Sequence, residues 1–107
     1  MKRGSVVTVA LQGDFGKGRP ALVVQSDLFA AHPSVRVLLM SHELVDAPLI
    51  RIQALPSEKN GLRMPCQIGV DKAFTVKREK IGSVIGEMEQ ETMLAVNRAM
   101  LVFLGLA

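Results

Sequence analysis

The sequence contains no tryptophan, no tyrosine and only four phenylalanines in 107 residues. Many proteins that bind single-stranded nucleic acids stack the bases on several aromatic rings. This chain has little with which to build such a platform. Any contact with nucleic acid is therefore expected to rely mainly on arginine, lysine and backbone groups.

Cysteine and histidine are equally scarce. Cys66 has no partner for an internal disulfide, and the spacing of His32 and His42 does not resemble a structural zinc site. We therefore expect no metal and no cofactor. The sequence offers no partner that would make Cys66 a reactive thiolate, so we interpret it as a small buried residue.

Long apolar runs are absent as well. No segment approaches the roughly 20 apolar residues that cross a bilayer, and the start Met1-Lys-Arg leads into an alternating stretch unlike a signal peptide. We expect a cytoplasmic protein with no membrane contact. A hydrophobic fraction of 49% is ample for a packed interior, so residues 1–107 are predicted to form one globular domain.

Charge is unevenly distributed along the chain. The net charge is +3, from thirteen basic and ten acidic side chains. Residues 1–80 carry twelve basic and seven acidic side chains (+5), whereas residues 81–107 carry one basic and three acidic (−2). The excess of positive charge on the first part is weak evidence for a polyanionic partner.

Hydrophobic patterning predicts a mainly β protein that ends in a helix. Short segments rich in apolar and β-branched residues predict strands over 5–11, 20–25, 34–40, 48–55, 64–70, 73–76 and 81–85. Their close spacing indicates a small barrel. From about Glu89 the period becomes helical, with Gly105 as a C-terminal stop and one apolar face made of Met93, Val96, Met100, Leu101 and Leu104. Glu87, Glu89 and Glu91 suit the helix start and are interpreted as structural.

The connections carry their own signals. Three glycines lie in the turn at 13–20, and Pro20 can stand at the first position of the following strand. Residues 26–32 can form a turn of helix capped by Ser26 or Asp27, and Asn60-Gly61 suits a turn with positive φ.

These pieces, in this order, resemble a known family. The start Met1-Lys-Arg-Gly4, the segment Gly18-Arg-Pro-Ala-Leu-Val-Val-Gln25, a third strand ending near Ser41, Gly61-Leu62 leading to Gln67 and the C-terminal helix are similar to the MazF/PemK toxins over the whole chain. The resemblance implies an α+β, mainly β fold: a small SH3-like antiparallel β-barrel with a C-terminal α-helix. It also implies the toxin of a type II toxin–antitoxin system that cleaves single-stranded RNA without metal.

The same resemblance implies the partners. They are RNA, a cognate antitoxin that binds through a disordered segment, operator DNA reached through the antitoxin complex, and a second copy of the chain. A monomer in sedimentation at micromolar concentration would contradict the homodimer.

Two residues match the family's catalytic positions. Arg19 corresponds to the arginine of the Arg-Pro motif, and Ser41 to a hydroxyl residue after the third strand. A guanidinium holds two phosphoryl oxygens and stays charged at any cellular pH, so Arg19 suits a developing phosphorane. The alternatives are a solvated strand-end arginine and a turn-capping serine. His42 is a candidate for proton transfer because its ordinary pKa is about 6.5, although a lone loop histidine is more often incidental.

Four further residues are candidates for RNA binding. Lys17 lies in the glycine-rich turn, Gln67 suits a base edge or a brace for the active loop, and Lys77 and Arg78 extend a phosphate track unless their run is an ordinary solvated turn.

The chain also departs from the PemK branch. Its arginine and aspartate near the fifth strand are aligned with Met64 and Cys66, its first-loop histidine is missing, and Ser5 replaces an acidic residue. Two other functions therefore stay open. One is a gyrase poison of the CcdB type, although that type depends on a tryptophan-containing tail, and the other is a barrel that binds RNA or protein without cutting.

Overall fold

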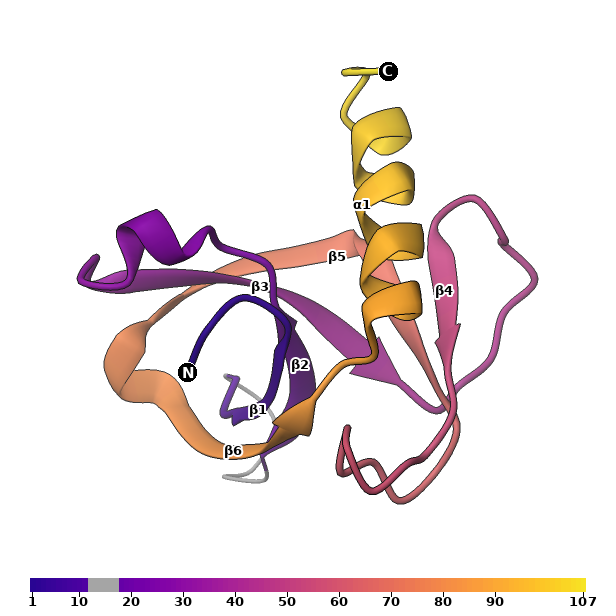
Figure 1. Cartoon of the computed structure of the whole chain (residues 1–107). Coiled ribbons are helices and arrows are strands. Elements are labelled where there is room, and N and C mark those ends of the chain that lie inside the picture. The colour runs from indigo at the N-terminus through magenta and orange to yellow at the C-terminus, as the bar shows by residue number, and fades with distance from the viewer. Residues whose placement is uncertain (12–17) are drawn as a thin grey trace.

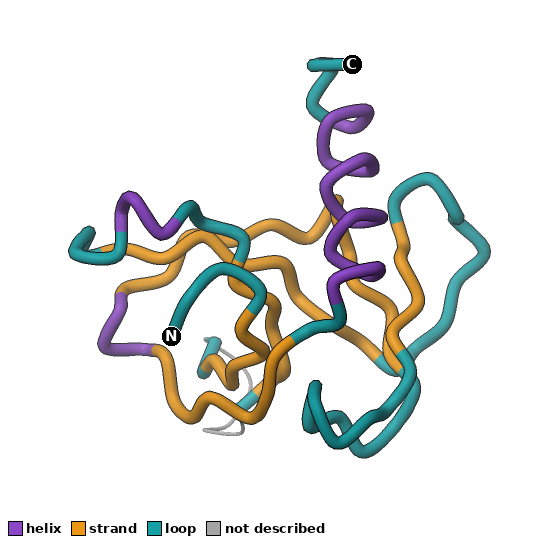
Figure 2. The backbone as a smooth tube through the Cα atoms, viewed as in Figure 1, coloured by secondary structure: helices purple, strands orange, loops and turns teal. Residues whose placement is uncertain are grey.

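The described residues form six strands and one long helix. The structure, a computed structural model, describes residues 1–11 and 18–107. Its strands form one antiparallel sheet in the order β4-β5-β3-β2-β1-β6 (Figures 1 and 2). The elements are β1 (Ser5–Val9), β2 (Arg19–Val23), the 3-10 turn η1 (Asp27–Phe29), β3 (Ser34–Ser41), β4 (Arg51–Ala54), β5 (Cys66–Lys77), the 3-10 turn η2 (Arg78–Lys80), β6 (Ile81–Glu87) and α1 (Gln90–Phe103).

The expected fold class is confirmed. The sheet curls around its own axis, and α1 follows β6 at the end of the chain (Figure 1). In the hydrogen-bonded order of the described residues β4 and β6 are the two edges, so the barrel is open and not closed. No described helix is long and apolar enough to cross a membrane.

Two of the expected strand boundaries were wrong. The segments 64–70 and 73–76 belong to one strand, β5. Its first half pairs with β4 and its second half pairs mainly with β3, so the strand continues through the polar residues Asp71 and Lys72. The strand expected over 48–55 begins only at Arg51. Pro48 occupies the second position of a turn in which the Ile50 amide donates to the Ala47 carbonyl at 3.1 Å.

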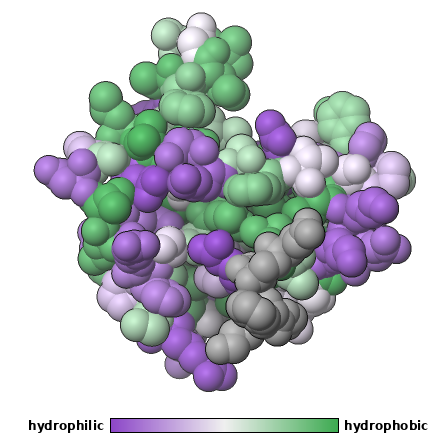
Figure 3. Space-filling model, turned by 180° about the vertical axis from the view of Figure 1, so that it is seen from behind, coloured by the Kyte–Doolittle hydropathy of each residue, from purple (hydrophilic) through white to green (hydrophobic). Residues whose placement is uncertain are grey.

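The core consists of two clusters, one on each side of the sheet. Side chains alternate along a strand, so Val6 and Val7, or Leu22 and Val23, contribute to opposite clusters. The first cluster is covered by α1, whose Val96 is completely buried. The helix then projects beyond the strands (Figure 1), so Leu101 and Leu104 of the expected apolar face are exposed. Hydrophobic atoms accordingly gather on the projecting end of the molecule in Figure 3.

The turn before β5 is locked to the start of α1 by Asn60. This side chain is fully buried; its amide nitrogen donates to the Leu55 carbonyl at 2.7 Å and to Glu89 Oε1 at 2.9 Å. Its amide oxygen accepts from the backbone of Ser57 and Leu62. The Ser57 hydroxyl also donates to Glu89, which lowers the pKa of that carboxyl. Glu89 is therefore structural, as the sequence indicates.

Gly61 shows why this turn needs glycine. Its φ is +71°, and a Cβ added there would lie 2.0 Å from the Ile85 carbonyl oxygen. The expected positive φ is confirmed, and the close approach to β6 adds a second requirement that the turn pattern does not reveal.

Asn60→Ala should lower the free energy of unfolding by roughly 2–4 kcal/mol, because it leaves two amides and a carbonyl without their partner around a side chain that is itself buried. Urea unfolding followed by circular dichroism measures this. Asn97→Ala is the matched control, since the half-buried Asn97 side chain forms one hydrogen bond among the described residues, from Arg3 Nη2, and its loss should cost about 1 kcal/mol or less. Equal losses in the two variants would contradict the role given to Asn60.

Candidate active site

Arg19, Ser41 and Gln67 lie in one row across three strands. Ala21 of β2 pairs with Leu39 of β3. Because the strands are antiparallel, Arg19, two residues before Ala21, and Ser41, two residues after Leu39, lie opposite each other on the same face of the sheet. Ser41 in turn pairs with Gln67 of β5. All three line one cavity of about 450 Å³, together with Leu39, Glu43, Val45, Arg51, Gly69, Lys72 and Phe74. We call this the Arg19–Ser41 cavity. The structure thus brings together Arg19 and Ser41, the two residues that the sequence analysis predicts to be catalytic.

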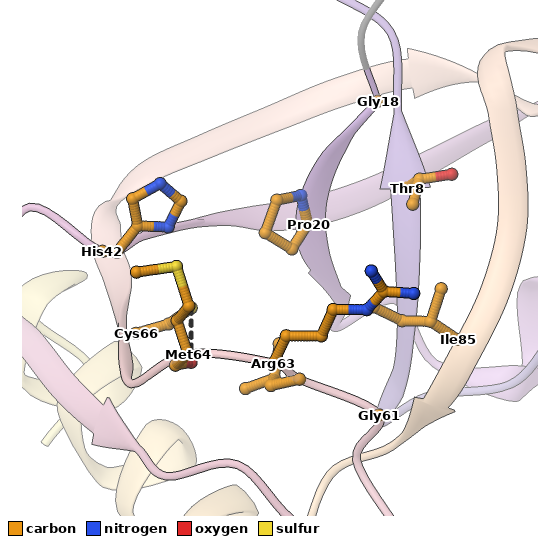
Figure 4. A pocket seen from close by; sticks show the side chains of 10 residues that line it. Thr8, Gly18, Pro20, His42, Gly61, Arg63, Met64, Cys66 and Ile85 are labelled. Carbon is orange, nitrogen blue, oxygen red and sulfur yellow. Dashed lines mark hydrogen bonds between the residues drawn. The ribbon is translucent and has the colours of Figure 1, made fainter.

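Pro20 and His42, the residues that directly follow Arg19 and Ser41, lie on the opposite face of the sheet. Pro20 and His42 line a second cavity of about 630 Å³ with Thr8, Arg63, Met64 and Cys66 (Figure 4). In Figure 4 the His42 ring lies on the Met64 side of this cavity, and Arg63 extends toward Ile85. His42 does not line the Arg19–Ser41 cavity. The reason is the two-residue period of a strand, which turns adjacent side chains to opposite faces.

Ser41 combines a structural bond with spare hydrogen-bonding capacity. Its Oγ accepts a bond from the Glu43 amide at 3.0 Å, which fixes the start of the loop after β3. This is the turn-capping role that the sequence left open. A hydroxyl that accepts one bond still has its hydrogen to donate, so the same geometry can orient that donor toward a ligand in the cavity.

Gln67 braces the loop after β3. Its Oε1 accepts from the Val45 amide at 3.0 Å, and its Nε2 donates to the Val45 carbonyl at 2.9 Å. Of the two roles considered for Gln67, the structure shows the bracing one. Because this loop also contains Glu43, the brace helps to set one wall of the Arg19–Ser41 cavity.

Arg51 and Asp71 form an ion pair beside the cavity that sequence reasoning missed. Arg51 Nε donates to Asp71 Oδ1 at 2.9 Å and Nη2 donates to Oδ2 at 3.1 Å. Both side chains are partly buried, with 16% of Arg51 and 21% of Asp71 exposed. The hydrogen bonds from Arg51 lower the pKa of Asp71. The polar position of Arg51 in an otherwise apolar strand, and Asp71 interrupting an apolar run, were the available signals.

The remaining charges give the cavity a positive character. Arg19 and Lys72 line it, and among the described residues neither forms a side-chain hydrogen bond or salt bridge within the fold. Among the described residues that line the cavity, Glu43 is the one carboxylate. Because Arg51 is paired with Asp71, the described lining carries two further cations and one anion. This balance favours a phosphate group over a neutral ligand.

The basic residues at the far end of β5 lie away from this site. Lys77 pairs with Ser34, at the opposite end of β3 from Ser41. Seven residue steps separate Ser34 from Ser41, about 23 Å at the usual rise of a strand. Arg78 Nε donates to the His32 carbonyl at 2.9 Å. The structure therefore does not bring Lys77 and Arg78 to the Arg19–Ser41 cavity, and Lys17 lies outside the described residues.

Cys66 is a small buried residue, as expected. It is 3% exposed, its Sγ donates to the Met64 carbonyl at 3.4 Å, and burial raises the pKa of its thiol. Met64 precedes β5 and faces the second cavity. β5 contains an aspartate, Asp71, which pairs with Arg51 beside the Arg19–Ser41 cavity but is not among the residues that line it. Over the described residues, no three or more acidic, histidine or cysteine side chains gather in a way that could hold a metal ion.

Comparisons with known proteins match the whole chain. A family model described as PemK-like, MazF-like toxin of type II toxin-antitoxin system matches residues 2–104. A protein of Mycolicibacterium smegmatis named probable endoribonuclease MazF is 39% identical over 108 residues, covering 100% of this chain and 99% of that protein.

Solved structures share the fold. One is an endoribonuclease in complex with its cognate antitoxin from a mycobacterial species, with a TM-score of 0.83 and 23% identity over 100% of this chain and 97% of that chain. Another is MazE–MazF from Deinococcus radiodurans, with a TM-score of 0.80 and 16% identity over 100% and 97% of the two chains.

Asp71→Asn should remove a stabilising term that depends on pH. The folded-state pKa of Asp71 is lowered, so its contribution is present above the ordinary carboxyl pKa of about 3.9 and is lost as pH falls through the folded value. The difference in urea midpoint between wild type and variant should therefore be largest near neutral pH and shrink below about pH 4. Glu87→Gln, which breaks the exposed pair with Lys2, is the control and should change little. A difference between wild type and Asp71→Asn that is constant with pH would contradict this account.

Proposed function

Because the chain belongs to the PemK-like, MazF-like toxins of type II toxin–antitoxin systems, we propose that it is an endoribonuclease that cuts single-stranded RNA in the Arg19–Ser41 cavity. The observation that carries the proposal is the shared face of Arg19 and Ser41, which line one positively charged cavity. The name of the 39% identical relative supports the same activity.

The proposed reaction uses the substrate's own nucleophile. The 2′-hydroxyl oxygen forms a bond to the adjacent phosphorus and loses its proton, while the bond from phosphorus to the 5′-oxygen breaks and that oxygen gains a proton. The products are a 2′,3′-cyclic phosphate and a 5′-hydroxyl. No metal enters this scheme. The protein has to align the attack and stabilise the charge that develops on the phosphoryl oxygens.

Arg19 is proposed to supply the charge stabilisation. Its guanidinium donates to two phosphoryl oxygens and gains interaction energy as their negative charge grows in the transition state. The hydroxyl of Ser41 donates its hydrogen to one of these oxygens, while the Glu43 amide holds its Oγ in place. Gln67 supports this arrangement indirectly by bracing the loop, and Lys72 adds positive charge at the cavity wall.

Proton transfer has no assigned group in this scheme. His42 is the sequence-based candidate, but it opens onto the second cavity. Lys17, Lys77 and Arg78 stay candidates for the path of the RNA outside the cavity, where they would add salt-dependent affinity without taking part in the chemistry.

The partners are part of the same proposal. We infer that the chain forms a homodimer in the cytoplasm, that a cognate antitoxin neutralises it through a disordered segment, and that their complex binds operator DNA. The mycobacterial endoribonuclease with its cognate antitoxin and the Deinococcus radiodurans MazE–MazF complex support the antitoxin in this inference.

Arg19→Ala should reduce the rate of RNA cleavage about 10²- to 10³-fold, because it removes a preorganised donor to the developing charge. Ser41→Ala should show a smaller loss. The rates are measured on mixed-sequence RNA with chelator present, after circular dichroism has shown that each variant is folded. Arg98→Ala, which removes an exposed helical arginine that does not line the Arg19–Ser41 cavity, is the matched control and should cleave like the wild type. Cleavage by Arg19→Ala at the wild-type rate would rule out this site.

A further inference from the structure

The Arg19–Ser41 cavity has an aromatic wall. Phe74 lies on β5 with its side chain 41% exposed and lines the cavity with Arg19 and Ser41. The other two described phenylalanines, Phe29 on η1 and Phe103 on α1, are also exposed but do not line it. In the part of the chain that the structure describes, one exposed aromatic ring therefore opens onto the proposed cleavage site.

An irregularity in β5 brings this ring to the cavity. Met40 of β3 pairs with Ile68, whereas Leu38, two residues earlier, pairs with Ala73. Five residue steps of β5 thus face two of β3, so the strand bulges around 69–72. Regular pairing then resumes, with Phe74 opposite Val37. Lys72 and Phe74 are two residues apart, and both side chains reach the cavity.

Packing does not account for the position of the ring. Apolar residues such as Leu39, which is 8% exposed, already cover the sheet at the floor of the cavity. The residues on both sides of Phe74, Ala73 and Thr75, are exposed as well. A leucine would cover the same patch of sheet. What phenylalanine adds is a flat aromatic face next to two cations.

A flat apolar face beside phosphate-binding groups matches the chemistry of one nucleotide. The cations Arg19 and Lys72 attract the backbone phosphate, and an aromatic ring stacks on the base of the same or the next nucleotide. We propose that Phe74 is the stacking platform for one nucleobase of the bound RNA. It is a positioning residue, which holds the strand so that a phosphate sits at Arg19. This inference rests on the proposed ribonuclease function.

Kinetics give the first test. Phe74→Leu should raise KM for an RNA that the wild type cuts by about tenfold, the scale of one lost base–aromatic stack, with kcat changed less than about threefold. Phe74→Trp should keep the wild-type KM, because indole stacks at least as well. Phe29→Leu is the matched control and should match the wild type. An unchanged KM in folded Phe74→Leu overturns the inference, as does a KM for Phe74→Trp as high as that of Phe74→Leu.

Fluorescence gives a second test that does not depend on cleavage. The chain has no tryptophan, so Phe74→Trp carries a single reporter. Its emission should be quenched by a 2′-O-methyl oligoribonucleotide pool of randomised sequence, which binds but lacks the attacking hydroxyl. The indole in Phe29→Trp should not respond. The inference is overturned if titration with this oligonucleotide pool leaves the emission of Phe74→Trp unquenched.

The two proposals fail in different ways. If the wild type leaves all RNA intact, the ribonuclease proposal fails, and quenching in Phe74→Trp alone decides whether the ring stacks on a base. If the wild type cuts RNA, the test is completed with versions of the oligonucleotide that it cuts, each lacking one base, and the binding of each version to the wild type and to Phe74→Leu is measured. One abasic position should weaken binding to the wild type but not to Phe74→Leu; equal weakening of both proteins at every position overturns the stacking role.

Discussion

The two-residue period of β2 and β3 is the constraint on which the rest of the site depends. It turns Arg19 and Ser41 to one face of the sheet and Pro20 and His42 to the other. A shift of one residue in the pairing of these strands would exchange the two sets of side chains. The register is held by the core, since Leu22 and Leu38 must enter one apolar cluster while Ala21 and Val37 enter the other. The cavity chemistry is thus tied to hydrophobic packing.

Polar contacts fix the segments that surround these paired strands. Gln67 holds the loop after β3, Arg51 and Asp71 bind each other at the bulge of β5, and Asn60 ties the turn before β5 to the start of α1. Each is a buried or half-buried group whose partners are backbone atoms or a charged side chain, so each restricts one segment around the sheet. Arg19 and Lys72 line the cavity, and neither forms a side-chain hydrogen bond or salt bridge with another described residue.

The sequence pattern was sufficient for the fold class, the terminal helix and the positive φ of Gly61, because each depends on local periodicity or backbone preference. The burial of Cys66 was predicted from the lack of any partner that would make it reactive. The sequence pattern failed where strand pairing determines the structure. Asp71 interrupts an apolar run in the sequence, but pairing with β3 and β4 keeps β5 continuous, and Arg51 neutralises the charge of Asp71. His42 next to Ser41 suggested one site, and strand alternation separates them. The low aromatic count argued against stacking, but among the described residues the position of Phe74 in the cavity wall suggests a use for its ring that composition cannot reveal.

The most direct test of the central claim is the chemistry of the ends that the purified wild-type protein leaves on mixed RNA in the presence of EDTA. An intramolecular attack directed by Arg19 and Ser41 predicts fragments cut at short recurring sequences, each with a 5′-hydroxyl and a 2′,3′-cyclic phosphate. Fragments with 5′-phosphate ends, or RNA left intact, would contradict it.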